Sequence, residues 1–185
     1  MLNFHERNNT MSTRTLTLTA LLTALLCLAG PVTLPIGPVP LSLTTAVLML
    51  MALLLGERAL LCCGLYLLLG LLGVPVFSGF TGGLAALSGP TGGFLPGYLL
   101  LTAAAGSICK RTDNRCLQAL AFLAGNALLY LTGTAWYMHL TGTSPLAAAA
   151  VCILPFLPGD ALKIIAVLTV GHAVKSRLKK AGLLG

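Results

Sequence analysis

The chain has 185 residues, of which 57% are hydrophobic and only 8% are charged, and its mean hydropathy is +0.95. This composition excludes an ordinary soluble domain and predicts an all-α integral membrane protein that forms one domain over residues 1–185. The formal net charge of +7 does not indicate nucleic-acid binding, because the basic residues stand in small clusters at the edges of apolar segments.

Three uncharged blocks, residues 15–56, 59–109 and 116–159, separate the charged junctions of the chain. Each block is longer than the roughly 40 residues that two membrane crossings need, so each predicts an out-and-back hairpin. All the junctions then lie on one side of the membrane. They hold ten of the eleven Lys and Arg residues, which predicts that this side is the cytoplasm and that both termini lie there.

The hairpins predict six membrane helices and a short helix before the last of them. The six are expected at residues 16–29, 43–55, 59–72, 94–108, 117–140 and 160–174, and the short one at 146–153. Four prolines and two glycines in residues 30–40 predict an extended loop on the outer side.

The connection over residues 73–93 is rich in glycine, apolar and without charge. It is too hydrophobic to lie in water and too interrupted for a lipid-facing helix. Non-helical backbone at membrane depth persists only where it is buried in protein or lines a cavity. The segment is therefore expected to fold back over the bundle as a lid, with a short helix at residues 83–87.

Asp160 and Lys163 are the only acid and base deep inside otherwise uncharged sequence. Their spacing of three places them on one face of a helix. The Pro158-Gly159 break predicts that this helix begins at Asp160, where a carboxylate suits the helix dipole. A lysine in an apolar environment needs a partner, so Lys163 is expected to be held by Asp160 or by a ligand.

The outer segments 38–45, 74–93 and 155–163 converge on one side of the membrane and predict a lidded pocket with few polar groups. Such a pocket suits a small, mostly apolar ligand. Glycines would let the backbone approach that ligand closely, although single glycines fit plain turns equally well. Asn126, Tyr66 and His172 are interpreted as hydrogen-bonding partners between helices.

Ala20 and Ala24 form a small-residue stripe on the first helix, which suits close contact with another helix, although internal packing explains it equally well. The chain has no P-loop, so an ATP site is not expected in it. It also lacks a nucleophile-elbow motif, and its cysteines show no zinc-site spacing.

Three stretches resemble the signature regions of the BioY biotin transport proteins in order and spacing. They are GPVPLSLTTAVLML at residues 37–50, GVPVFSGFTGGLAALSGPTGGFLPGY at 73–98 and PFLPGDALK at 155–163. The resemblance extends over about residues 16–175. Thr44 departs from it, since the family commonly has Gln at this position.

The resemblance implies the substrate-binding S component of an energy-coupling factor (ECF) vitamin transporter in the cytoplasmic membrane of a prokaryote. Such a subunit captures biotin from outside and is neither an enzyme nor bound to a cofactor. It associates with a transmembrane coupling protein and two ATPase subunits. Alternatively it acts as a solitary biotin transporter, in which case the resemblance is compatible with a homo-oligomer. The implied ligand contacts are Asp160, Lys163, Tyr98, Gly82, Gly83, Gly92, Gly93, Phe77 and Thr44. Ala20 and Ala24 would face the coupling protein.

Other functions stay open at this point. They are an S component for another small vitamin, a small intramembrane enzyme that uses Asp160 and Lys163, and a channel or purely structural subunit. A binding subunit would return its ligand unchanged after unfolding, whereas an enzyme would alter it.

Overall fold

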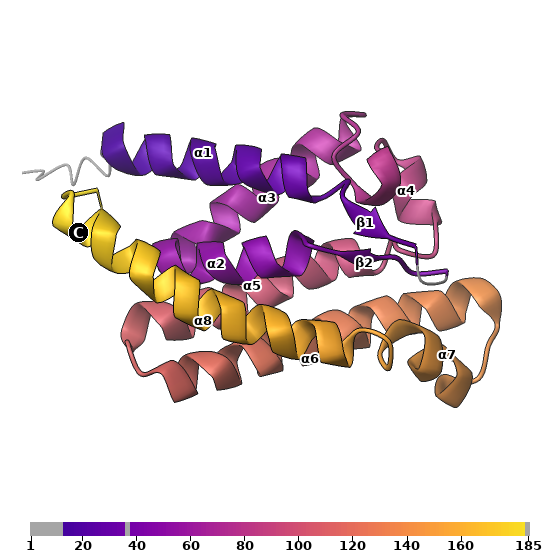
Figure 1. Cartoon of the computed structure of the whole chain (residues 1–185). Coiled ribbons are helices and arrows are strands. Elements are labelled where there is room, and N and C mark those ends of the chain that lie inside the picture. The colour runs from indigo at the N-terminus through magenta and orange to yellow at the C-terminus, as the bar shows by residue number, and fades with distance from the viewer. Residues whose placement is uncertain (1–12, 36–37, 184–185) are drawn as a thin grey trace, which may run out of the picture.

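The computed structural model describes residues 13–35 and 38–183 of the chain. Six long helices run back and forth between two ends of a bundle (Figure 1). They are α1 (Thr13–Ala29), α2 (Thr44–Leu55), α3 (Ala59–Leu71), α5 (Phe94–Arg111), α6 (Arg115–Thr141) and α8 (Leu157–Lys180). Three helical stretches are long and apolar enough to cross a membrane, namely α6, α8 and the pair α2–α3 taken together.

Shorter elements connect these helices. They are β1 (Thr33–Leu34), β2 (Leu41–Ser42), the 3-10 turns η1 (Gly56–Arg58) and η2 (Ser78–Phe80), α4 (Ala85–Ser88) and α7 (Pro145–Cys152). The predicted helical fold is therefore confirmed, except that Thr33–Leu34 of the expected loop at residues 30–40 pair as a short antiparallel strand with Leu41–Ser42, just after it.

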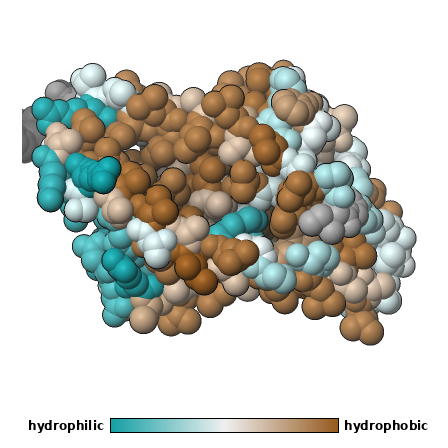
Figure 2. All heavy atoms as spheres, in the orientation of Figure 1, coloured by the Kyte–Doolittle hydropathy of each residue, from teal (hydrophilic) through white to brown (hydrophobic). Residues whose placement is uncertain are grey.

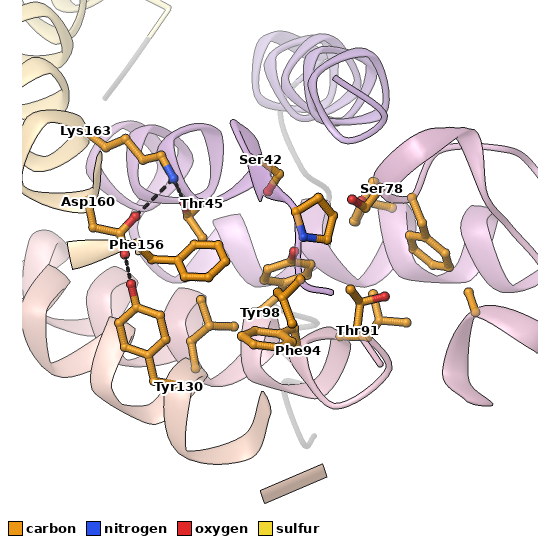
Figure 3. Close-up of a pocket in the computed structure, with 17 residues that line it drawn as sticks. Ser42, Thr45, Ser78, Thr91, Phe94, Tyr98, Tyr130, Phe156, Asp160 and Lys163 are labelled. Carbon is orange, nitrogen blue, oxygen red and sulfur yellow. Dashed lines mark hydrogen bonds and ion pairs between the residues drawn. The ribbon is translucent and has the colours of Figure 1, made fainter. Parts of the chain in front are cut away.

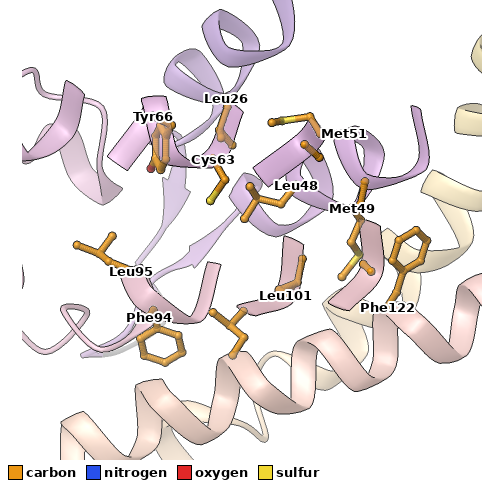
Figure 4. Packing of buried hydrophobic residues seen from close by; sticks show 14 of the residues in the cluster. Leu26, Leu48, Met49, Met51, Cys63, Tyr66, Phe94, Leu95, Leu101 and Phe122 are labelled. Carbon is orange, nitrogen blue, oxygen red and sulfur yellow. The ribbon is translucent and has the colours of Figure 1, made fainter. Parts of the chain in front are cut away.

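Helix α5 lies at the centre of the bundle, against α2, α3 and α6. Leu48, Leu101 and Phe122 are fully buried among these helices (Figure 4). Glycine lets α5 and α6 approach closely, because a Cβ atom on Gly97 would lie only 2.6 Å from Oγ1 of Thr132. Helix α8 packs on the other side of α2, and α1 covers α2 and α3.

In the part of the chain that the structure describes, the charged junctions gather at one end of the bundle, as predicted. Lys110 and Glu57 form an ion pair of 2.7 Å there, and Lys175 and Asp113 form another of 2.8 Å. Figure 2 shows hydrophilic residues concentrated at this end and hydrophobic residues over the middle of the visible face. Glu6 and Arg7, which belong to the first predicted junction, lie outside the described residues.

The predicted lid covers the opposite end, and hydrogen bonds hold it to α3, to α6 and, through Gly79 and Pro31, to the segment after α1. The amide of Gly83 donates to the carbonyl of Gly70 at 2.7 Å, which attaches the lid to α3. The Tyr66 hydroxyl donates to the carbonyl of Val76 at 3.1 Å, and Trp136 Nε1 of α6 donates to the carbonyl of Gly89 at 3.0 Å. The lid is thus attached to the bundle by specific hydrogen bonds.

The predicted start of the last helix at Asp160 is wrong by three residues. Helix α8 begins at Leu157, and the amide of Asp160 already donates to the carbonyl of Phe156 at 2.8 Å. Pro158 fits the first turn because the amide hydrogen it lacks has no partner within the helix at that position. The same helix continues to Lys180 beyond the predicted end at Val174, since lysine and arginine favour helix outside the membrane.

The short helix in the lid also differs from the prediction. It covers 85–88 instead of 83–87, because Gly83 has a φ of +78° and cannot belong to a right-handed helix.

Candidate substrate-binding site

A pocket of about 650 Å³, including the space at its mouth, lies beneath the lid at the loop end of the bundle. We call it the outer pocket. Its lining residues are Val39, Pro40, Ser42, Thr45, Tyr66, Phe77, Ser78, Ala86, Thr91, Phe94, Leu95, Tyr98, Leu129, Tyr130, Phe156, Asp160 and Lys163.

Asp160 and Lys163 form a buried ion pair at one end of the outer pocket (Figure 3). The ammonium nitrogen of Lys163 lies 3.0 Å from Oδ1 of Asp160 and donates to Oγ1 of Thr45 at 2.9 Å. Only 11% of the Lys163 side chain and 8% of the Asp160 side chain are exposed. The expectation that the two charges pair with each other is therefore confirmed, and α2 supplies a second partner for the lysine.

Helix α6 supplies two further partners of the carboxylate. Asn126 Nδ2 donates to Oδ2 of Asp160 at 3.1 Å, and the hydroxyl of Tyr130 donates to the same oxygen. Asn126 and Tyr130 are four residues apart, so they lie on one face of α6. This contact between α6 and α8 fixes the position of Asp160.

The hydrogen bonds leave two groups available to a ligand. A carboxylate has about four acceptor sites and an ammonium has three donor hydrogens. Oδ2 of Asp160 has two donors and is occupied, whereas Oδ1 accepts only from Lys163. Lys163 uses two of its three hydrogens, on Asp160 and on Thr45. One acceptor and one donor therefore remain side by side at this end of the pocket.

Aromatic side chains form the middle of the outer pocket. Phe94 and Tyr98 project from α5 between the charged end and the lid (Figure 3). Phe156 closes the wall near the ion pair, and its ring centroid lies 6.4 Å from that of Tyr130. These surfaces suit the apolar body of a ligand, because aromatic rings bury a large area with few degrees of freedom.

The opposite end of the outer pocket is polar but without charge among the described residues. Ser78 of the lid and Thr91 lie there, away from Asp160 and Lys163 (Figure 3). The hydroxyl oxygen of Ser78 is buried and has no hydrogen-bond partner in the described part of the chain. A buried hydroxyl without a partner is costly, so this oxygen is a position where a ligand would complete the hydrogen bonding.

Of the predicted ligand contacts, Asp160, Lys163, Tyr98 and Phe77 line the outer pocket. Thr44 does not. It is fully buried at the first residue of α2, and the next residue, Thr45, faces the pocket instead.

The four predicted glycine contacts, Gly82, Gly83, Gly92 and Gly93, are absent from the pocket lining. Three of them permit close packing of the lid, since a Cβ atom on Gly82 would lie 2.5 Å from the carbonyl oxygen of Val74. A Cβ atom on Gly92 would lie 2.0 Å from the carbonyl oxygen of Leu87, and one on Gly93 would lie 2.1 Å from Cβ of Trp136. Their small size is thus explained by packing within the protein.

Sequence reasoning missed Tyr130 and Thr45 as members of the site. Tyr130 lies in an apolar helix and resembles an ordinary membrane tyrosine, although its spacing of four from Asn126 was a usable signal. His172 of α8 lies 2.7 Å from Oε1 of Gln118 on α6, so its interpretation as a partner between helices is confirmed. Tyr66 differs from that interpretation, because it donates to the carbonyl of Val76 in the lid and also lines the outer pocket.

Ala20 and Ala24 are exposed on α1, whereas Thr19, Thr23 and Leu26 of the same helix are buried against the bundle. Internal packing therefore does not explain the alanine stripe. It lies on a face of α1 that is free to contact another helix.

Comparisons with known proteins agree on one group. The model of the BioY family matches residues 5–180. A probable biotin transporter BioY of Pyrococcus horikoshii is 34% identical over 83% of this chain and 91% of its own length. Biotin transporter BioY2 of Lactococcus lactis is 35% identical over 86% and 88%. A crystal structure of the S-component for biotin from an ECF-type ABC transporter superimposes with a TM-score of 0.82 at 27% identity, and the match covers 90% of this chain and 95% of that one.

Proposed function

The chain belongs to the BioY family, and from this premise we propose that it binds biotin and serves its uptake as the S component of an ECF-type transporter. It is a membrane transport protein and not an enzyme. The relatives that it matches over most of their length are likewise named biotin transporters. Biotin is its substrate, and Asp160 and Lys163 bind this substrate without reacting with it.

The free acceptor and donor at the charged end carry the proposal for how biotin binds. Biotin has a ureido ring with N–H donors next to a carbonyl acceptor, a sulfur-containing ring, and an apolar tail that ends in a carboxylate. Oδ1 of Asp160 accepts from a ureido N–H, and the third hydrogen of Lys163 donates to the ureido carbonyl.

The tail then extends past Phe94 and Tyr98 toward the lid. An acid beside the carboxylate of the ligand would repel it, which favours placing the tail far from Asp160. Ser78 and Thr91 offer hydroxyl donors at that end.

The exposed stripe of Ala20 and Ala24 supports a contact with a transmembrane coupling protein, which in turn binds two ATPase subunits. A solitary biotin transporter, assembled as a homo-oligomer through the same stripe, is the second form of this proposal. The end of the bundle that carries the charged junctions faces the cytoplasm in both forms, because basic residues favour that side.

Analysis of the bound ligand tests the proposal directly. The protein is purified in detergent from cells grown with biotin, unfolded, and the released small molecules are identified by mass spectrometry. Intact biotin at about one molecule per chain is expected. Another vitamin would refute the choice of substrate, and a chemically altered product would refute the assignment as a binding subunit.

A further inference from the structure

A second cavity, of about 610 Å³, lies at the charged end of the bundle between α2, α5 and α8. We call it the inner pocket. Leu53, Leu54 and Leu55 at the end of α2 form part of its lining. Its polar lining includes four basic residues, Lys110, Arg111, Lys175 and Lys179, and one acid, Asp113. The proposed binding of biotin makes no use of this cavity.

The basic residues of the inner pocket exceed the acids that pair with them. Lys110 pairs with Glu57 at 2.7 Å, and Lys175 pairs with Asp113 at 2.8 Å. The second oxygen of Asp113 lies 3.9 Å from the ammonium nitrogen of Lys179, and Arg111 has no ion pair among the described residues. Two positive charges therefore remain uncompensated around one cavity, which favours an anion.

The setting of the cavity indicates where the anion comes from. A basic lining at the end of an otherwise apolar membrane bundle matches the boundary between lipid headgroups and acyl chains. Helix α8, which carries Lys175 and Lys179, also exposes the large apolar residues Ile165 and Val170 along its length. Acyl chains would cover such residues while a phosphate occupies the basic lining.

We propose that the inner pocket binds the phosphate group of an anionic phospholipid. Arg111 and Lys179 are the residues whose charge is most available to it, because the other two lysines are held by the shorter ion pairs. A soluble phosphate ester shares this chemistry but lacks the acyl chains. An experiment can therefore distinguish a phospholipid from a soluble phosphate ester.

The experiment measures lipid binding to the purified full-length protein in neutral detergent, by native mass spectrometry and by the shift in unfolding temperature. The probes are dioleoylphosphatidylglycerol, dioleoylphosphatidylcholine and glycerol 3-phosphate. The test variant is Arg111→Gln with Lys179→Gln, which leaves both shorter ion pairs intact. The control variant, Arg58→Gln with Lys180→Gln, removes the same charge from exposed residues that are not part of the cavity lining.

Phosphatidylglycerol is expected to raise the unfolding temperature of the parent protein more than phosphatidylcholine does. Each basic residue near an anionic lipid contributes about fivefold in affinity, so the test variant should bind phosphatidylglycerol roughly twenty-five-fold more weakly. The control variant should keep the parent affinity. Retained biotin binding in both variants verifies that each is folded.

Two results would overturn the proposal. Equal loss of lipid binding in the test and control variants would show attraction to net charge alone, without a site. An equal shift with glycerol 3-phosphate and with phosphatidylglycerol would assign the inner pocket to a soluble phosphate and exclude the lipid.

Discussion

Replacing Asp160 with asparagine removes one negative charge and keeps the size of the side chain. In the parent protein the carboxylate accepts from Lys163 at 3.0 Å, from Asn126 at 3.1 Å and from the Tyr130 hydroxyl. The NH2 group of asparagine would face at least one of these donors, so at least one hydrogen bond would be lost. Lys163 would also lose its charged partner. The ureido ring of biotin would lose a charged acceptor at the same time.

The size of the effect follows from this burial. Removing one partner of a buried, hydrogen-bonded charged contact costs about 2 to 5 kcal/mol, which corresponds to a roughly thirty-fold to five-thousand-fold weaker Kd. Lys163→Ala should weaken biotin binding in the same direction. Helix content should persist in both variants, because apolar packing around α5 holds the bundle.

Isothermal titration of biotin into the purified variants measures the effect. Asp113→Asn is the matched control, since it also removes a carboxylate from a lysine but acts at the inner pocket. Its Kd for biotin should stay within about threefold of the parent. The reasoning fails if Asp160→Asn also stays within about threefold, a difference of about 0.7 kcal/mol.

The methyl ester of biotin tests which end of the ligand Asp160 contacts. Neutralising the tail should cost the same affinity in the parent and in Asp160→Asn, to within about 0.5 kcal/mol, because distant changes are additive. The alternative result is that esterification weakens binding more in Asp160→Asn than in the parent. The tail would then lie at Asp160, and the proposed orientation would be wrong.

Three further predictions concern the rest of the chain. Ser176→Cys, in a variant without the native cysteines, should resist membrane-impermeant thiol labelling from outside intact cells; strong labelling would reverse the topology. Ala24→Leu should weaken uptake or complex formation while biotin titration stays unchanged, because the residue lies on the exposed face of α1; loss of both would favour a role in folding. Lys175 lowers the pKa of Asp113, chiefly through the hydrogen bond between them, so the ionised acid stabilises the folded state at neutral pH. Asp113→Asn should therefore unfold at a lower temperature than the parent at pH 7, and the gap should close as the pH falls through the lowered pKa of Asp113 and protonates the acid. A gap that stays the same down to the most acid pH at which the protein folds would contradict the pairing.

Much of the fold could be predicted because charge is excluded from the hydrocarbon region. The uncharged blocks set the number of crossings, and the junctions had to gather at one end. The partnership of Asp160 and Lys163 was also predictable, since it depends only on a spacing of three along one helix. Their role as biotin contacts stays a prediction.

The partners from other helices could not be predicted in the same way. Tyr130 is 30 residues from Asp160, and Thr45 is 118 residues from Lys163. Such contacts depend on how each helix is rotated about its axis, and the apolar surroundings of a membrane helix do not mark one face. A glycine likewise does not reveal whether a ligand or a neighbouring backbone occupies the space beside it. Packing within the protein accounts for Gly92 and Gly93, and their contact with a ligand stays a prediction.

The attachments of the lid are expected to affect the rate of binding, and the contacts at Asp160 to affect its strength. In the proposed binding mode biotin enters the outer pocket from outside past the lid, and opening the lid would break contacts such as those made by Tyr66, Trp136 and the amide of Gly83. These contacts join parts of the protein to each other and include no ligand atom. Weakening one of them should accelerate entry and exit together and leave the equilibrium nearly unchanged. Changes at Asp160 act chiefly on exit. The residence time of biotin is thus controlled at two separate places in the molecule.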